Sequence, residues 1–246
     1  MDPLTAAAAN GLQASMDSFD MLANNLANAS TTGFKADREF YSTYLAPEAD
    51  GELNPSVGES PIVQKQWTDF AQGTLLNTGS PTDLALSGAG FFAVNGPAGP
   101  LYTRSGNFHF SPKGVLVSAE GYPVRLSGNQ TLQSQSANPL QVGSDGQISQ
   151  DGNPLGQLEV ANFKDATQLT RSAGAYFQNG DTAANPIVAS SAQVYQGKTE
   201  ASNAAPAEAA AKMISMMRRF EMLQHAVKIG TDMNRQAIEE VAKVGS

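Results

Sequence analysis

Few residues of this chain have side chains suited to catalysis or metal binding. Its 246 residues include two histidines, His109 and His225, and no cysteine. The lack of cysteine excludes disulfides, thiolate metal sites and thiol nucleophiles, and two isolated histidines make a poor zinc site. A nucleophilic serine would need a histidine partner and an elbow motif, G-x-S-x-G, that the sequence lacks. We therefore interpret His109 as an exposed strand residue and His225 as a residue flanking a helix seam.

Three other patterns resemble functional sites only superficially. Gly88-Ala89-Gly90-Phe91 resembles the start of a dinucleotide-binding loop, but strand-forming residues follow it where a helix should open. Asp145-Gly146 and Asp151-Gly152 lack the carboxylate spacing of a calcium loop and are better interpreted as hairpin turns. Three carboxylates could supply a glycosidase pair, although no spacing singles them out: Asp83, Glu120 and Asp165. The sequence predicts no enzyme, no cofactor and no metal site.

The charge and hydropathy of the chain limit the kinds of partner that it can bind. The chain has 15 basic and 23 acidic side chains and a formal net charge of -8, which argues against nucleic-acid binding. No apolar run is long enough for a membrane span. The start, Met1-Asp2-Pro3-Leu4, has neither the basic region nor the apolar core of a cleaved signal peptide, so we expect any export to use another route.

The first third of the chain predicts an amphipathic helix. Asp2 and Pro3 are suited to the N-cap and first helical positions, and Gly33 can take the left-handed conformation after the helix end near 28–32. Apolar residues recur at spacings of four and three, as in a coiled-coil seam: Leu12, Met16, Phe19, Ala23 and Leu26.

The C-terminal segment predicts a second helix, which begins at Pro206 and Glu208. Its first apolar stripe is Met213, Met216, Phe220, Leu223 and Val227, and its second is Met222, Ala226, Ile229 and Met233. Since one partner helix cannot cover both stripes, we expect the two terminal helices to pair within a subunit and the remaining face to be buried against other subunits. Coverage of that face by the central domain is the alternative.

The middle of the chain predicts a compact all-β domain over 81–199, with short apolar stretches between glycine-marked turns. Residues 35–80 predict an extended connector, with an edge strand or ribbon near 62–70 and 73–77. Residues 1–34 and 200–246 would form the helical domain. The predicted fold class is α+β, with paired terminal helices and a central all-β domain.

Four ordered segments together resemble flagellar rod and hook proteins. Residues 23–35 resemble the asparagine-rich signature that ends in Gly-Phe-Lys, and 83–92 and 102–108 are similar to paired β motifs of that family. Glu200-Ala201-Ser202-Asn203, followed by Met213-Ile214 and Arg218-Arg219-Phe220-Glu221-Met222, completes the pattern. The resemblance marks a signature and candidate export segment at Asn24, Asn25, Leu26, Asn28, Thr32, Gly33, Phe34 and Lys35.

The resemblance implies a structural subunit of the flagellar basal-body rod. Such a subunit would polymerise through its terminal helices into a hollow, torque-transmitting axle in the periplasm that forms part of the export channel. Its partners would be copies of itself, other rod proteins and the type III export apparatus. The 218–222 stretch looks closer to the proximal-rod type. Three alternatives stay open: a distal-rod subunit, a helix-docking module outside the rod, and a glycan hydrolase that clears the cell wall.

Overall fold

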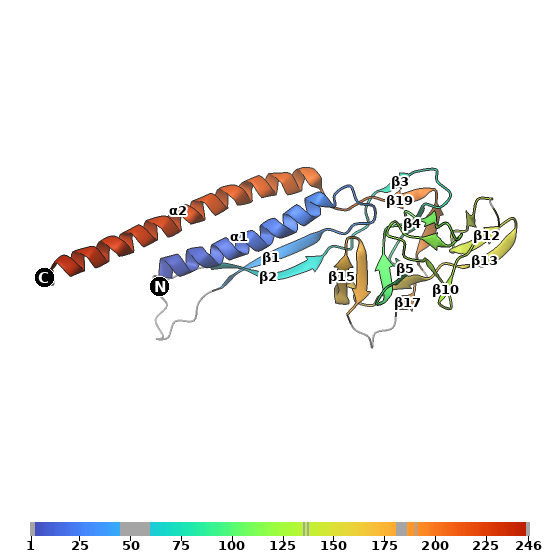
Figure 1. Cartoon of the computed structure of the whole chain (residues 1–246), viewed down its shortest axis with the longest axis horizontal. Coiled ribbons are helices and arrows are strands. Elements are labelled where there is room, and N and C mark those ends of the chain that lie inside the picture. The colour runs from blue at the N-terminus through green and yellow to red at the C-terminus, as the bar shows by residue number, and fades with distance from the viewer. Residues whose placement is uncertain are drawn as a thin grey trace. The chain divides into compact units, whose positions relative to one another are not determined.

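The computed structural model describes residues 3–44, 60–134, 136, 138–180, 186–189 and 191–244 (Figure 1). Their contacts form two compact units. The helical unit comprises the described residues of 1–27, 37–67 and 205–246, and the β-rich unit those of 28–36 and 68–204. The predicted α+β class is confirmed at this level, because a long helix lies near each end of a β-rich middle.

The helical unit contains two antiparallel helices and a β-ribbon. Helix α1 spans Pro3–Ala27 and helix α2 spans Pro206–Val244, so the predicted start at Pro206 is confirmed, whereas the predicted N-cap Asp2 lies outside the described residues. Strands β1 (Asp37–Tyr44) and β2 (Ser60–Thr68) pair with each other, and β1 contacts α1. Figure 1 shows the two helices side by side.

The two helices pack closely at Gly11 of α1. A Cβ atom added to Gly11 of α1 would lie 3.3 Å from Cδ1 of Leu223 of α2. Gly11 and Leu223 therefore lie opposite each other in the antiparallel pair. Helix α2 has 39 residues and α1 has 25, a difference of 14 residues or about 21 Å at about 1.5 Å per residue. The last turns of α2 therefore extend past the start of α1.

The β-rich unit is built from short antiparallel strands around a six-stranded sheet of order β15-β16-β6-β5-β14-β17. The sheet strands are β5 (Phe91–Gly96), β6 (Gly99–Thr103), β14 (Val160–Asn162), β15 (Leu169–Ala173), β16 (Tyr176–Asn179) and β17 (Ile187–Val188). Smaller sheets pair β3 (Leu75–Asn77) with β19 (Lys198–Glu200), β4 (Leu84–Ser87) with β18 (Gln193–Gln196), β7 (His109–Phe110) with β8 (Leu116–Val117), and β9 (Arg125–Leu126) with β10 (Gln130–Thr131). A three-stranded sheet joins β11 (Gln141–Val142), β12 (Gln147–Gln150) and β13 (Asn153–Gln157), and the 3-10 helix η1 spans Ala166–Gln168.

The six-stranded sheet is buried on both faces. Consecutive side chains of a strand point to opposite faces, and both Phe91 and Phe92 of β5 are buried. Phe92 packs in the larger core, where its ring makes an edge contact with Phe108 at 5.3 Å between centroids. Phe91 packs in the smaller core, 6.1 Å from the ring of Phe177. The apolar run at 91–94 therefore serves two cores at once.

A predicted hairpin turn is confirmed at Asp151-Gly152. Strands β12 and β13 pair up to Gln150 and Asn153, which leaves these two residues as the loop. Their φ angles are +54° and +80°, as expected for the turn type whose twist matches paired strands. The predicted Asp145-Gly146 turn is also confirmed, because β11 and β12 pair on either side of residues 143–146. Asp145 accepts a hydrogen bond from the backbone N–H of Gln147 at 3.0 Å within this turn.

Candidate functional site

The chain makes a tight corner after α1 that only glycine can form. Gly33 has a φ of +68°, a conformation that other residues adopt at a cost. A Cβ atom at this position would lie 2.1 Å from the backbone nitrogen of Ser105 and 2.3 Å from the carbonyl carbon of Arg104. Both the backbone angle and the close approach of a second segment therefore require glycine.

Next to this corner lies a buried ion cluster. The Lys35 Nζ atom donates to Oε1 of Glu200 at 2.5 Å and to the carbonyl oxygen of Ala71 at 2.7 Å. Nη1 of Arg104 donates to Oε2 of Glu200 at 3.2 Å, and the backbone N–H of Gly73 donates to Oε1 at 2.9 Å. The side chains of Lys35 and Glu200 are 0% exposed, and that of Arg104 is 5% exposed. Both carboxylate oxygens are occupied, which suits a structural tie better than proton transfer.

Desolvation dominates the electrostatics of this cluster. Burial lowers the pKa of Lys35, and the adjacent Glu200 carboxylate opposes that shift. Burial likewise lowers the pKa of Arg104, again against the attraction of Glu200. Glu200 thus faces two cations, and Nε of Arg104 has no hydrogen-bond partner within the described part of the chain. Removing one member of such a cluster typically costs about 3–5 kcal/mol, because a buried charge is left uncompensated.

The amide of Asn203 joins three backbone segments near the ion cluster. Its Oδ1 accepts from the backbone N–H of Ala36 at 2.7 Å. Its Nδ2 donates to the carbonyl oxygens of Asp69 at 2.7 Å and Ala71 at 3.0 Å. The backbone N–H of Asn203 also donates to the carbonyl of Phe34 at 3.3 Å. One side chain therefore satisfies polar groups of residues 36, 69 and 71.

Arg171 holds the same corner from strand β15. Its Cζ lies 4.6 Å from the ring centroid of Phe34 and 5.0 Å from that of Phe177. Nη2 donates to the carbonyl of Lys35 at 2.5 Å, and Nη1 donates to that of Gly174 at 2.8 Å. The planar guanidinium thus contacts two aromatic rings while hydrogen-bonding in its own plane, which lysine could not reproduce.

The residues of the predicted signature lie at this corner or lead into it. Asn24 is exposed, Leu26, Asn28 and Thr32 are half-buried, and Asn25, Gly33, Phe34 and Lys35 are buried. Asn25 pairs with the backbone of Asp37 twice, donating through Nδ2 at 2.7 Å and accepting at Oδ1 at 2.9 Å. The structure thus gives several signature residues a local role, and their role in export stays a prediction.

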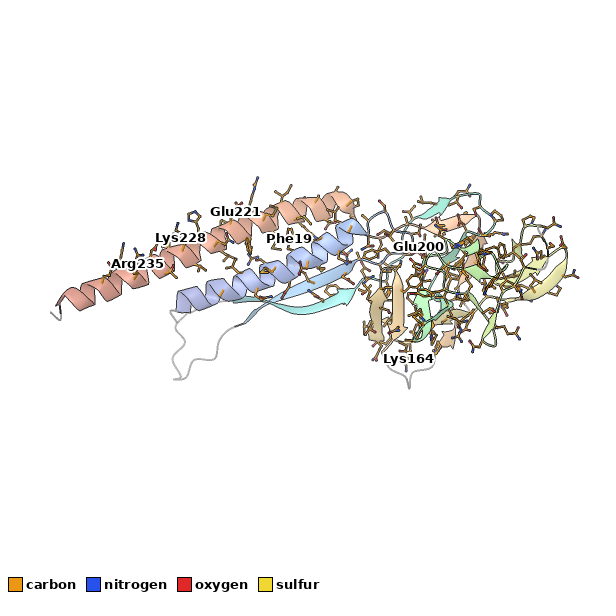
Figure 2. The ribbon with its side chains drawn as sticks, viewed as in Figure 1. Phe19, Lys164, Glu200, Glu221, Lys228 and Arg235 are labelled. Atoms are coloured by element: carbon orange, nitrogen blue, oxygen red, sulfur yellow. The ribbon has the colours of Figure 1, made fainter. Side chains whose placement is uncertain are left out.

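A second feature is the apolar surface of α2. The five residues of its first predicted stripe are half-buried, and Leu223 faces Gly11 of α1: Met213, Met216, Phe220, Leu223 and Val227. In the second stripe, Ala226 is half-buried, while Met222, Ile229 and Met233 are 66%, 55% and 63% exposed. Figure 2 shows the charged residues Glu221, Lys228 and Arg235 along the edge of α2 away from α1. The helix therefore has a paired apolar face, an uncovered apolar stripe and a charged edge.

On α1 the buried ridge lies one position before each residue of the predicted seam. Leu12, Ala23 and Leu26 are half-buried, whereas Met16 and Phe19 are 52% and 37% exposed. The buried ridge is Gly11, Ser15, Ser18, Leu22 and Asn25. The hydroxyl of Ser15 donates to the carbonyl of Gly11 at 2.7 Å, and that of Ser18 donates to Glu39 of β1 at 2.7 Å. The ridge thus combines three small residues with Leu22 and Asn25, while Met16 and Phe19 lie beside it and are more exposed.

The other candidate residues serve local structure. Glu120 accepts a hydrogen bond from the Tyr176 hydroxyl, and Asp165 caps η1 by accepting from the backbone N–H of Thr167 at 2.9 Å. The backbone of Asp83 bridges to that of Asn107. His109 and His225 are both exposed. Within the described ranges, no cluster of three metal-ligating side chains occurs and no helix is long and apolar enough to span a membrane.

Sequence reasoning about candidate sites missed Arg104, Arg171, Glu200 and Asn203 as structural anchors. Arg104, Glu200 and Asn203 lie in segments that resemble the rod and hook family, but their spacing gives no sign that they meet. Lys35 and Glu200, for example, are 165 positions apart. Arg171 lies in an ordinary polar strand, and no local pattern marks it.

Three family models match successive parts of the chain. The flagella basal body rod protein model matches residues 6–35, and the flagellar hook protein FlgE/F/G D1 domain matches residues 85–150. The flagellar basal body rod FlgEFG protein C-terminal model matches residues 195–240. The first and third models include the corner and the Glu200–Asn203 segment, and the second includes Arg104.

Full-length relatives agree with these models. The chain is 33% identical over 231 residues to the flagellar basal-body rod protein FlgF of Caulobacter vibrioides, with 92% of each chain covered. It is 31% identical over 203 residues to FlgF of Mesorhizobium japonicum, with 82% of each covered. It is also 31% identical over 247 residues to FlgG of Buchnera aphidicola, covering 90% of this chain and 93% of the relative. The chain thus belongs to the flagellar basal-body rod protein family, of the FlgF/FlgG type.

Proposed function

We propose that this chain is a structural subunit of the bacterial flagellar basal-body rod. The single observation that carries the proposal is the uncovered stripe on α2, where Met222, Ile229 and Met233 are each more than half exposed. Large apolar side chains that recur at helical spacing on a solvent-exposed surface typically mark a protein interface. The relatives named as basal-body rod proteins support the same assignment.

This stripe supports polymerisation through the terminal helices. The apolar side chains left exposed on the two helices differ, with Met16 and Phe19 on α1 and the second stripe on α2. A contact between two different surfaces that does not close into a ring builds an open helical filament. Such a filament forms the hollow drive shaft that transmits torque and lines part of the export channel. The partners are copies of this chain and other rod proteins.

The chain reaches the periplasmic rod through the flagellar type III export apparatus. The absence of cysteine from all 246 residues suits such a route, since no disulfide has to form after export. The resemblance of residues 218–222 to proximal members favours a proximal position in the rod. Immunogold labelling of isolated basal bodies would distinguish proximal from distal placement.

The stripe can be tested by one substitution in full-length protein. Ile229→Asp places a charge in the stripe and is expected to abolish motility and incorporation into basal bodies, while the near-UV circular dichroism of the β-rich unit stays unchanged. Gln224→Asp is a matched control. It introduces the same residue at another exposed position, about 140° around the helix at about 100° per residue. Normal assembly of Ile229→Asp would refute the assignment of this stripe as an interface.

A further inference from the structure

The chain passes between its two units four times, after residues 27, 36, 67 and 204. Three of these passages meet at Asn203. Its amide accepts from Ala36 and donates to Asp69 and Ala71, while the backbone N–H of Asp69 donates to the carbonyl of Ala36 at 2.8 Å. All these atoms belong to the β-rich unit. The segments that leave this unit are therefore bound to one another within it.

Glu200 binds the segment of the fourth passage, which follows residue 27, to the same hydrogen-bond network. Its carbonyl oxygen accepts from the N–H of Gly33 at 2.7 Å, and Gly33 lies six residues after the end of α1 at Ala27. Its carboxylate accepts from Lys35, Gly73 and Arg104. Without this carboxylate, two buried cations would face each other uncompensated.

These polar contacts lie outside the two hydrophobic cores, although Phe70 of the 69–73 segment packs against the smaller core. The buried members of those cores come from residues 84–194, and none belongs to 28–36 or 200–203. Hydrogen bonds and buried ion pairs, together with the packing of Phe34 against Arg171, hold the two segments. Such regions open at a lower free energy than the core they rest on.

We propose that Glu200 and Asn203 form a clasp, which binds residues 33–36 and 69–73 and opens and closes as one cooperative element. The β-rich unit is complete only when segments from both ends of the chain, 28–36 and 200–203, are in place. A chain that lacks either segment leaves buried charges or backbone groups unpaired. The clasp rests on contacts within one unit and does not depend on the proposed role in the rod.

The test is amide hydrogen exchange, read residue by residue by NMR on the full-length protein. Glu200→Gln keeps the size of the side chain and removes its charge. Exchange at Gly33, Ala36 and Gly73 is expected to rise together by at least about tenfold, while the amides of β5 and β6 keep their rates. Ala36 is the decisive probe, because its acceptor is Asn203 and the substitution does not touch it directly.

The reciprocal variant, Asn203→Ala, changes no charge and leaves the residues of the ion cluster in place. Asn203→Ala removes the acceptor of Ala36, and exchange at Gly73, whose acceptor is Glu200, is expected to rise as well. Glu159→Gln is the matched control, since its ion pair with Arg125 lies in the same unit but the two side chains are 23% and 16% exposed. It should leave all three probes unchanged. Two results would overturn the clasp: an unchanged exchange rate at Ala36 in Glu200→Gln, or an unchanged exchange rate at Gly73 in Asn203→Ala. Loss of the central sheet in either variant would overturn it as well.

Discussion

The Nζ atom of Lys35 lies 2.5 Å from Oε1 of Glu200, and both side chains are fully buried although 165 positions separate them. One residue follows α1 closely and the other precedes α2. Burying both charges carries a large desolvation cost, so the pair contributes less to net stability than its short distance suggests. We expect its stronger effect to be on specificity, because any other placement of either segment would leave a buried charge unpaired.

The first prediction concerns the corner that this pair holds in place. Gly33→Ala should lower the free energy of unfolding of the β-rich unit by at least about 3 kcal/mol, since it adds left-handed strain to a steric clash. The clash is severe, because the new Cβ atom would lie 2.1 Å from the backbone nitrogen of Ser105. Urea unfolding followed by near-UV circular dichroism measures the loss.

Gly79 provides a matched control for the backbone strain alone. Its φ of +70° is close to the +68° of Gly33, but no atom lies within 4 Å of a Cβ added there. Gly79→Ala should therefore cost only about 1–2 kcal/mol. Equal losses in the two variants would mean that the approach of Ser105 to the corner does not matter.

The second prediction is a loss of stability at alkaline pH that depends on Tyr176. Burial raises the pKa of Tyr176, and its hydrogen bond to Glu120 raises it further. Because the pKa is higher in the folded chain than the value of about 10 in an unfolded one, the unfolded chain loses a proton first as pH rises above about 10. Stability then falls with pH, by up to about 1.4 kcal/mol per pH unit from this group.

Tyr176→Phe removes this contribution and should make stability fall less steeply above pH 10. Some slope should remain, because burial also raises the pKa of Tyr102. At pH 7 the variant should lose no more than about 1 kcal/mol, the typical net worth of one hydrogen bond. Urea unfolding at several pH values compares the two proteins, and identical slopes above pH 10 would contradict the assignment.

The sequence predicts the elements of this fold better than their contacts. Helix α2 begins at Pro206 as expected, and the Asp151-Gly152 turn forms, because proline at a helix start and a residue pair tolerant of positive φ act locally. The pairing of β1 with β2 and of β3 with β19 has no such local signal. These partners are chosen by contacts that close only in the folded chain.

The sequence likewise predicts one part of the candidate surfaces correctly and misses another. Helical periodicity places Met222, Ile229 and Met233 on one stripe, and they are exposed together. The same rule on α1 selects the large residues Met16 and Phe19, whereas the buried ridge includes the small residues Gly11, Ser15 and Ser18. A hydrophobicity pattern favours large apolar side chains, but close helix packing depends on the absence of side-chain volume, which such a pattern does not register.

The last prediction tests that close packing. Gly11→Val should weaken the pairing of α1 with α2, since even a Cβ atom at this position lies 3.3 Å from Cδ1 of Leu223 and valine adds two further methyl groups. Gln13→Val is the matched control, because Gln13 is exposed and its amide donates an exposed hydrogen bond to Asp17. Intrinsic helix propensity predicts the opposite order, as valine is a better helix former than glycine and a poorer one than glutamine. Amide exchange along α1 should therefore rise by about tenfold or more in Gly11→Val and change little in Gln13→Val. A more protected α1 in Gly11→Val would show that propensity, and not packing against Leu223, determines the stability of this helix.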